Sequence, residues 1–305
     1  MTIGGRLAAL LEMGSFVVTG EIVPPRGASA DSVTAHAREL VGYVDAVNVT
    51  DNPTASAHMS PLAGARFVFD AGIEPTVQLT SRDRNRLGIT ADLLGAWALG
   101  ARNVFCLSGD PIQIGDHPDA IVVNDITVNG LVSLAKRLRE DGTTLSGVEI
   151  ADPPRYLIGV ADVPLAEHYD PEKLEGKLDA GADFVMTQIV YDVDLLEAWA
   201  DGMRSRGLFE RAKVIIGVAP LQSAKQARFM DERLPGVHVP ASTLAALDAA
   251  DQDAAEVGTA ITVEVVKRIR DMPGVAGIHV MGMGHDAIVR SVVQRSGLFP
   301  RPSRR

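Results

Sequence analysis

The sequence predicts an α/β fold in which parallel strands alternate with helices and close into a (βα)8, or TIM, barrel. The first observation is a strand–helix–strand unit, in which short β-branched runs at 75–80 and 103–108 flank a helical apolar pattern at 89–100. The second is that similar strands recur, mostly about 30 residues apart. The third is that no G-x-G-x-x-G follows the first strand, which weakens the competing open doubly wound sheet. One barrel domain spanning 1–305 is expected.

Strands are recognised by their Val- and Ile-rich runs and by the turn residues that follow them. Pro24 and Pro25 end the first strand, because proline cannot donate a ladder hydrogen bond. Asp51 and Asn52 mark the end of the second strand. The expected strands cover residues 15–23, 45–50, 75–80, 103–108, 156–160, 184–190, 213–218 and 277–281.

Helices are expected where apolar residues recur at helical spacing, as Leu131, Leu134 and Leu138 do. Asp170 suits the N-cap of one of them. A long loop over 109–120, rich in Gly, Pro and Asp, is a candidate for covering a ligand. The expected helices cover residues 29–43, 55–71, 89–100, 126–140, 171–181, 194–205, 223–234, 241–270 with a break near 251–253, and 286–295.

Composition narrows the class of protein. The chain is 46% hydrophobic and 22% charged, which allows a full core, and its formal net charge of −10 argues against a nucleic-acid or polybasic membrane partner. No uninterrupted apolar run reaches ~18 residues, and the N-terminal segment 1–16 reads as an amphipathic helix rather than a signal peptide. A cytoplasmic protein is expected. Cys106, the single cysteine, is expected in the core, and His238 and His285 lack metal-ligand spacing, so no metal site is expected.

The carboxyl ends of barrel strands meet at one mouth, where chemistry is usually found. Two carboxylates and several neutral amides there suit acid–base or cation-stabilising chemistry on a heterocycle. One carboxyl group would donate a proton, and the other, left ionised, would stabilise a developing cation. The side chains expected at this mouth are Glu21, Asn48, Thr50, Gln78, Thr80, Ser108, Asp110, Gln188 and the segment 281–285.

Each of these residues also has a structural interpretation. Glu21 could form a buried salt bridge, Asp110 could shape a turn, and Gln188 could be a satisfied core amide. The charged segment 82–85 could bind a ligand or form a solvated cluster at a helix start. The functional interpretation is favoured for Glu21, because an unpaired acid in an apolar strand is costly. It is also favoured for Asp110.

Four segments, in order along the chain, resemble the methylenetetrahydrofolate reductases. They are GEIVPPRG around Glu21, NVFCLSGDP around Asp110, LDAGADFVMTQIVYD around Gln188, and VIIGVAPLQSAKQARFM at the seventh strand. The similarity runs over about 15–297. It implies a (βα)8 barrel that binds a flavin, usually FAD. It also implies reduction of 5,10-methylenetetrahydrofolate to 5-methyltetrahydrofolate with hydride from NADH or NADPH, in the one-carbon metabolism that serves methionine biosynthesis.

The resemblance assigns roles by position. Glu21 matches the general acid that helps to open the methylene bridge to a 5-iminium cation, and Asp110 matches the carboxylate that stabilises this cation. Gln188 matches the residue that hydrogen-bonds the folate, and Gln78 belongs to the same substrate site. The positions matching flavin contacts are Thr50, Ser108, Asp110, Asp170 and Lys177.

Three departures from the family pattern fall in the implied flavin site. Gln78 stands where the family commonly has His, Ser108 stands where it has Arg, and segment 159–167 lacks a Tyr-Pro-Glu sequence. Losing the arginine removes a charged contact worth roughly 1–3 kcal/mol. Weaker flavin binding is therefore expected, with FMN in place of FAD, or direct hydride transfer from NAD(P)H, as alternatives.

The same resemblance leaves two rival functions. One is an enzyme that runs the reaction backwards and oxidises methyltetrahydrofolate. The other is a folate-binding subunit that needs a separate protein to deliver electrons. A tetrahydrofolate is the expected substrate in each case. A homo-oligomer is also expected, because proteins of this family often form homo-oligomers.

Overall fold

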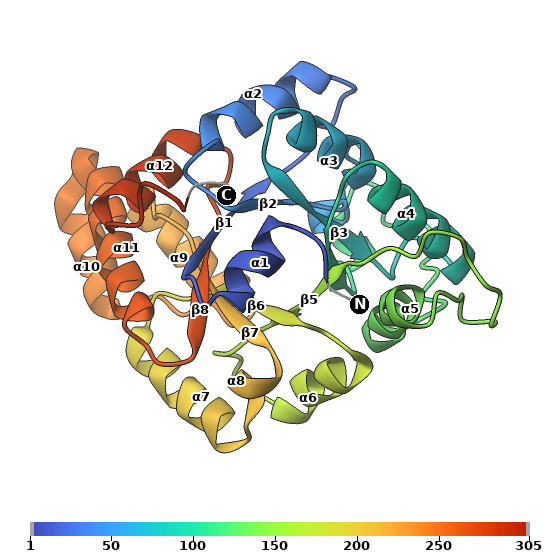
Figure 1. The fold of residues 1–305 in the computed structure, drawn as a ribbon. Coiled ribbons are helices and arrows are strands. Elements are labelled where there is room, and N and C mark those ends of the chain that lie inside the picture. Colours follow the sequence, from blue (N-terminus) through green and yellow to red (C-terminus); the bar gives the residue numbers. More distant parts are fainter. Residues whose placement is uncertain (1–2, 303–305) are drawn as a thin grey trace.

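The computed structural model describes residues 3–302 and contains a closed barrel of eight parallel strands. Each strand pairs with the next one in the chain, and β8 pairs with β1 to close the ring (Figure 1). The strands are β1 Val17–Ile22, β2 Ala46–Val49, β3 Glu74–Thr80, β4 Asn103–Leu107, β5 Leu157–Asp162, β6 Phe184–Ile189, β7 Lys213–Val218 and β8 Val275–Val280. The predicted barrel and its strand order are confirmed.

Helices surround the barrel, and α1 lies across the end of the ring that faces the viewer in Figure 1. They are α1 Arg6–Glu12, α2 Ala30–Leu40, α3 Pro61–Asp70, α4 Arg86–Ala98, α5 Val128–Glu140, α6 Pro171–Ala180, α7 Val193–Ser205, α8 Leu208–Arg211, α9 Ala224–Arg233, α10 Ala241–Ala250, α11 Ala254–Arg270 and α12 Asp286–Arg295. Short 3₁₀ turns lie at Pro53–Ala55, Ile112–Ile114 and Asp251–Asp253. The last of these is the predicted break in the long helix. Over the described residues, no helix combines the length and the apolar character needed to cross a membrane.

One predicted boundary is wrong by several residues, because the helix expected from residue 55 begins at Pro61. Ser60 caps that helix by accepting a hydrogen bond from the Leu62 backbone N–H. The α-helix cannot begin at residue 55, because Thr54 and Ala55 have φ values of 54°, in the left-handed region.

The outward side chains of the strands are apolar and pack against the helices. Val47, Val77 and Val104 are each 0% exposed and belong to this main core. Cys106 lies in the same layer, as predicted, and burial raises the pKa of its thiol to about 12. The outward face therefore holds the barrel together and leaves the inward face free for other uses.

The inward face of the barrel is divided by chemistry. Phe105, Phe184 and Ile215 fill the β4 to β7 side and pack against α1. On β1 and β2 the inward positions begin with the apolar Val17 and Ala46 and continue with the polar Thr19 and Asn48. Apolar and polar side chains thus lie next to each other inside the barrel.

The amino-terminal end of the barrel is closed by α1 and by buried charge. Glu74 accepts hydrogen bonds from the Arg6 and Leu7 backbone N–H groups, at 2.5 and 3.0 Å, and so caps α1. Asp45 accepts hydrogen bonds from Arg6 at 3.0 Å and from Arg301 at 2.6 Å, although its own side chain is fully buried. Both ends of the described chain are fastened at this one carboxylate.

Candidate active site

The carboxyl ends of the strands form the mouth at the opposite end from α1. Glu21 lies near the end of β1 and is paired in register with Asn48 of β2. Gln78 lies on β3 and is 8% exposed, and Gln188 lies on β6 and is partly buried. Strand alternation turns all four side chains toward the barrel interior.

Glu21 faces a histidine that the sequence reasoning missed. The Oε2 atom of Glu21 lies 3.9 Å from Nε2 of His279 on β8, and the His279 ring is 3% exposed. On the other side of the ring, Nδ1 lies 2.9 Å from the Thr19 hydroxyl. His279 stands two residues before Met281, so period-2 alternation would have placed it at the mouth.

The hydrogen bonds of Thr19 indicate how the His279 ring is arranged. The Thr19 hydroxyl lies 2.9 Å from Nδ1 of His279 and 3.4 Å from the Ile278 carbonyl oxygen. The contact with Nδ1 orients the ring so that Nε2 faces Glu21.

Asp110 lies on the loop after β4 and is exposed to solvent. Its Oδ2 atom accepts a hydrogen bond from the Thr54 backbone N–H at 2.6 Å, which joins this loop to the one after β2. Gly109 has φ = 86°, a left-handed conformation that favours glycine and sets the direction of Asp110. Glu21 and Asp110 therefore lie at the same end of the barrel, with β2 and β3 between their strands.

Arg82 is buried, so the solvated interpretation of this member of the 82–85 cluster is wrong. It is 3% exposed and pairs with Asp83 at 2.6 Å. Its other donors reach the Asp110 carbonyl at 2.8 Å and the Asn52 carbonyl at 3.4 Å. The hydrogen bond from Arg82 holds the pKa of Asp83 below its ordinary value. One guanidinium thus links the loops after β2, β3 and β4.

A second ion pair at the mouth joins β2 to β3. Asp51 is 3% exposed and accepts from both Arg84 nitrogens, at 2.6 and 2.9 Å. The same carboxylate accepts from the backbone N–H and the hydroxyl of Thr80, at 2.9 and 3.0 Å. Bidentate geometry and burial make this pair a rigid support for the mouth.

The other residues assigned by resemblance differ in whether their polar groups already have hydrogen-bond partners in the protein. The Thr50 hydroxyl is buried and has no hydrogen-bond partner within residues 3–302. Gln188 uses its Oε1 atom to accept from the Ile189 backbone N–H at 2.9 Å, which leaves its amide NH₂ group for another acceptor. Ser108 is exposed. Asp170 caps α6 by accepting from the Glu172 N–H at 3.1 Å.

Lys177 points toward the protein rather than into open solvent. Its Nζ atom donates to the Ala161 carbonyl at 2.6 Å, and burial lowers the pKa of its ammonium group. Asp162, which lies nearby, is held by Tyr169 at 2.9 Å, and burial raises the pKa of the Asp162 carboxyl. Lys177 is therefore a less available cation than its position in the sequence suggests.

The predicted covering loop packs on the mouth. Asp116 accepts hydrogen bonds from the Ala57 backbone N–H at 3.1 and 3.2 Å. At Gly115 an added Cβ would lie 1.9 Å from the Ala55 carbonyl oxygen, so only glycine permits this close approach. The loop after β4 is thus fastened to the loop after β2 at two further points.

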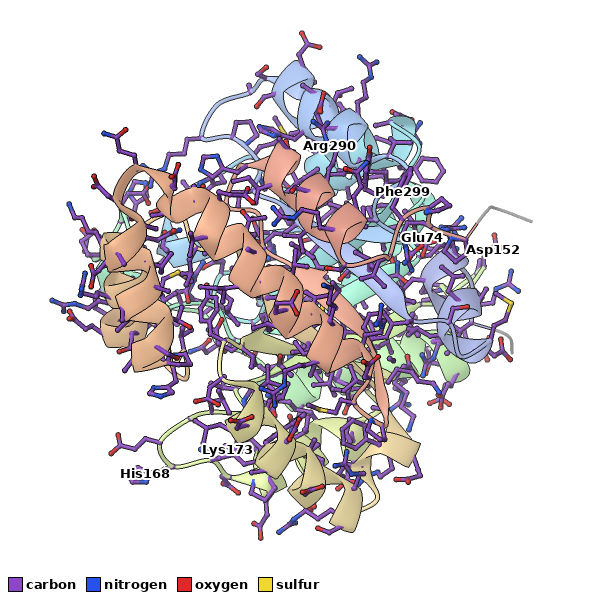
Figure 2. All side chains as sticks on the ribbon, turned by 90° about the vertical axis from the view of Figure 1, so that its left-hand side faces the viewer. Glu74, Asp152, His168, Lys173, Arg290 and Phe299 are labelled. Atoms are coloured by element: carbon purple, nitrogen blue, oxygen red, sulfur yellow. The ribbon has the colours of Figure 1, made fainter. Side chains whose placement is uncertain are left out.

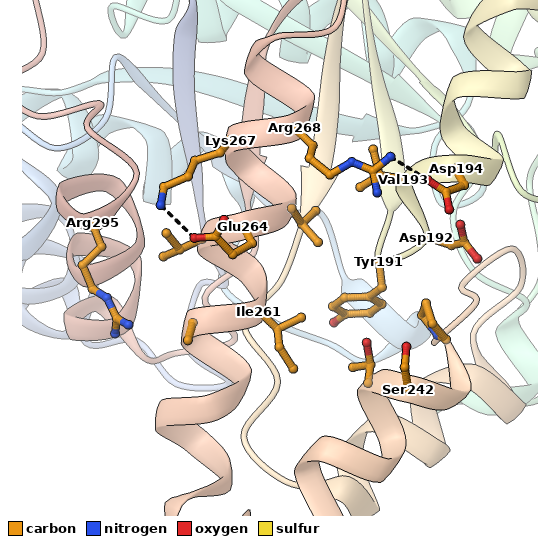
Figure 3. A pocket seen from close by; sticks show the side chains of 15 residues that line it. Tyr191, Asp192, Val193, Asp194, Ser242, Ile261, Glu264, Lys267, Arg268 and Arg295 are labelled. Atoms are coloured by element: carbon orange, nitrogen blue, oxygen red, sulfur yellow. Dashed lines mark hydrogen bonds and ion pairs between the residues drawn. The ribbon is translucent and has the colours of Figure 1, made fainter.

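A separate pocket of 790 Å³ lies on the flank of the barrel between α7, α10 and α11 (Figure 3). Tyr191 and Ser242 line one part of it, and cations line another. These cations are paired with acids, as when Arg268 contacts Asp194 at 2.6 Å. None of the residues predicted for the active site lines this pocket.

The chain is similar in sequence to proteins of one known family. Residues 6–297 match the sequence profile of the family described as methylenetetrahydrofolate reductase. Methylenetetrahydrofolate reductase 1 of Schizosaccharomyces pombe is 27% identical over 242 residues, 75% of this chain and 37% of the relative. The 5,10-methylenetetrahydrofolate reductase of Escherichia coli is 27% identical over 239 residues, 75% of this chain and 72% of the relative. The chain thus spans well under half the length of the fission yeast relative.

Among solved structures, one similar fold is an uncharacterised protein from Clostridium thermocellum that binds two copies of 5-methyl-5,6,7,8-tetrahydrofolic acid. It superposes with a TM-score of 0.61 at 13% sequence identity, covering 93% of this chain and 98% of that one. At this identity the likeness concerns the fold.

Proposed function

The chain belongs to the methylenetetrahydrofolate reductase family, and we propose that it reduces 5,10-methylenetetrahydrofolate to 5-methyltetrahydrofolate with hydride from NADH or NADPH. The observation that carries the proposal is the pairing of Glu21 with His279 inside a mouth that also holds Asp110. Relatives named for NADH and for NADPH both occur, in Arabidopsis thaliana and Caenorhabditis elegans, so either donor is consistent with the family.

Glu21 is proposed as the acid that starts the reaction. Its proton goes to N10 of the folate as the bond between N10 and the methylene carbon breaks, which leaves a cationic iminium at N5. Nε2 of His279, 3.9 Å from the Glu21 carboxyl group, is proposed to position this acid for the step. Hydride addition to the methylene carbon then gives the N5-methyl group and discharges the cation.

Asp110 and Gln188 are proposed to hold the folate in this reaction. The Asp110 carboxylate is exposed at the mouth, and an anion there stabilises the iminium cation. Its orientation is fixed by the Thr54 N–H. The free amide NH₂ of Gln188 and the buried amide of Gln78 offer hydrogen bonds to the polar edge of the pterin ring.

Enzymes of this family are flavoproteins, and the residues at the mouth of the barrel meet part of the requirements of a flavin. The buried, unpartnered hydroxyl of Thr50 fits a contact with the flavin, which would supply hydride relay between nicotinamide and folate when bound. Fewer free cationic side chains are present to bind the phosphates of FAD. Lys177 is used by the Ala161 carbonyl, and Arg82 is used by Asp83 and two backbone carbonyls. We therefore propose a flavin that is held weakly.

The experiment that tests the function is Glu21→Gln assayed beside the wild type with methylenetetrahydrofolate and reduced nicotinamide. The amide keeps the shape of the side chain and removes the proton. Turnover is expected to fall on the order of 10²–10⁴-fold, with nicotinamide oxidation by an artificial acceptor retained. Wild-type folate turnover in the variant would remove Glu21 from the mechanism, and a wild type that reduces no folate would reject the proposed function.

The absorbance spectrum of the freshly purified wild type belongs to the same experiment. If the flavin is bound weakly, its absorbance bands should correspond to less than one flavin per protein chain. The flavin content should fall further after gel filtration. A stoichiometric FAD that survives gel filtration would contradict the reasoning from Lys177 and Arg82. Folate reduction by flavin-free protein would indicate direct transfer from the nicotinamide.

A further inference from the structure

A row of polar side chains crosses the interior of the barrel on three neighbouring strands. Asn48 of β2 is paired in register with Thr76 of β3, and Thr76 is paired with Asn103 of β4. Each is at most 1% exposed. Their strand neighbours Val47 and Val77 face the helices, so alternation turns the row inward. Because barrel strands are tilted, the row also descends along the barrel axis.

Each member of the row carries a side-chain oxygen that has no hydrogen-bond partner in the part of the chain that the structure describes. These atoms are Oδ1 of Asn48, Oγ1 of Thr76 and Oδ1 of Asn103. Leaving three adjacent buried polar atoms unpaired would cost free energy, and buried water molecules commonly satisfy such groups by making about three hydrogen bonds each. A buried water molecule at each of these three register-paired positions would satisfy the three atoms.

The row ends at a carboxyl group on each face. At the mouth, Asn48 is the register neighbour of Glu21, whose carboxyl faces His279. At the closed face, Asn103 Nδ2 donates to Glu74 Oε1 at 2.9 Å, and Glu74 also faces the N–H groups of Arg6 and Leu7. Figure 2 shows Glu74 beside α1, on the side away from His168 of the loop after β5.

We infer that Asn48, Thr76 and Asn103 bind a file of water molecules that carries protons between the closed face of the barrel and Glu21. The inference rests on the proposed function, in which Glu21 gives one proton to N10 in each turnover and must recover one from solvent. Along the file, each water accepts a proton from its neighbour and gives one to the next, so one proton enters at the Glu74 end for each one delivered. Bound folate covers the mouth, and this path lets Glu21 recover its proton while the product is still bound.

The test is a single turnover, with enzyme in excess over methylenetetrahydrofolate, in weak buffer with a pH indicator. Nicotinamide oxidation reports hydride transfer, and a folate chase reports product dissociation. In the wild type, uptake of one proton is expected to keep pace with hydride transfer and to precede product dissociation. In Thr76→Val, hydride transfer in the first turnover is expected to keep its rate, while proton uptake slows to the rate of product dissociation.

Two further variants control for packing. Thr76→Ser keeps the hydroxyl and is expected to restore early proton uptake. Thr262→Val removes another buried hydroxyl, one bonded to the Gly258 carbonyl within α11, and is expected to leave the uptake unchanged. Thermal unfolding of Thr76→Val is an independent test of whether water is bound there. Removing a water-bound hydroxyl lowers the melting temperature, whereas removing an unpaired hydroxyl raises it.

The outcomes separate the two proposals. Wild-type uptake that waits for product dissociation would overturn the water file even if Thr76→Val did not fold. Early uptake that persists in Thr76→Val, or a raised melting temperature, would overturn it as well. A wild type that oxidises no nicotinamide on adding folate would instead reject the reductase function itself.

Discussion

At the scale of single residues, the candidate site depends on a contact that joins the first strand to the last. Glu21 on β1 meets His279 on β8, and Thr19 on β1 orients the ring from its other nitrogen. Glu21 and its position at the mouth could be predicted, because an acid before two prolines ends an apolar strand. His279 could not be paired with it from sequence alone, since 258 residues separate them and only barrel closure brings them together.

His279→Gln tests whether this ring positions the acid. A glutamine keeps a polar group in the same space but removes the imidazole ring that contacts Thr19 and Glu21. The kcat/KM for folate is therefore expected to fall on the order of 10²-fold. The pH profile of kcat/KM should change shape, whereas the KM for nicotinamide should stay constant.

Thr19→Val is the matched variant, because it removes only the hydroxyl that orients the ring. Its defect should be smaller than that of His279→Gln and should not add to it in the double variant. A fully additive double variant would show that the two residues act independently.

At the scale of elements, the loops after β2, β3 and β4 behave as one unit. Arg82 links all three, Asp110 bonds Thr54, and Asp116 bonds Ala57. The sequence predicted a charged cluster at 82–85 and a covering loop at 109–120. It could not predict that Arg82 turns inward, because burial of an arginine depends on acceptors supplied by the other two loops.

Arg82→Lys tests this unit. Lysine keeps the charge but cannot span Asp83 and two carbonyl groups at once. The free energy of unfolding is expected to fall by about 1–3 kcal/mol, and the KM for folate is expected to rise about tenfold as Asp110 loosens. Chemical denaturation and steady-state kinetics measure these effects, and Arg86→Lys, at an exposed pair with Asp125, is the control.

At the scale of the whole molecule, the barrel was the most predictable feature. Strand periodicity and the spacing of strand–helix units specify a parallel barrel, because right-handed crossovers leave few alternatives. Its closed end was less predictable. The sequence indicated a helix at 1–16, but its docking under the barrel needs the Glu74 carboxylate, which caps it from a distant strand.

Asp45→Asn tests how much this closed end contributes to stability. The variant leaves the guanidinium groups of Arg6 and Arg301 without their shared anion. Loss of one partner from a buried pair costs about 3–5 kcal/mol, so the free energy of unfolding should fall by that order. Folate kinetics below the melting temperature should hardly change, because the mouth lies at the other end. A variant of wild-type stability would show that α1 and Arg301 dock without this charge.

The shared carboxylate at Asp45 also has a practical consequence for handling the protein. Because Arg6 and Arg301 both reach it, the two extremities of the described chain lie at the α1 end of the barrel, away from the mouth, on either side of α1 (Figure 1). A surface tether attached at either extremity would orient every molecule with its substrate entrance facing the bulk liquid. A short peptide could also join the two extremities, so that circular permutants can be made with new termini in the loops between the outer helices.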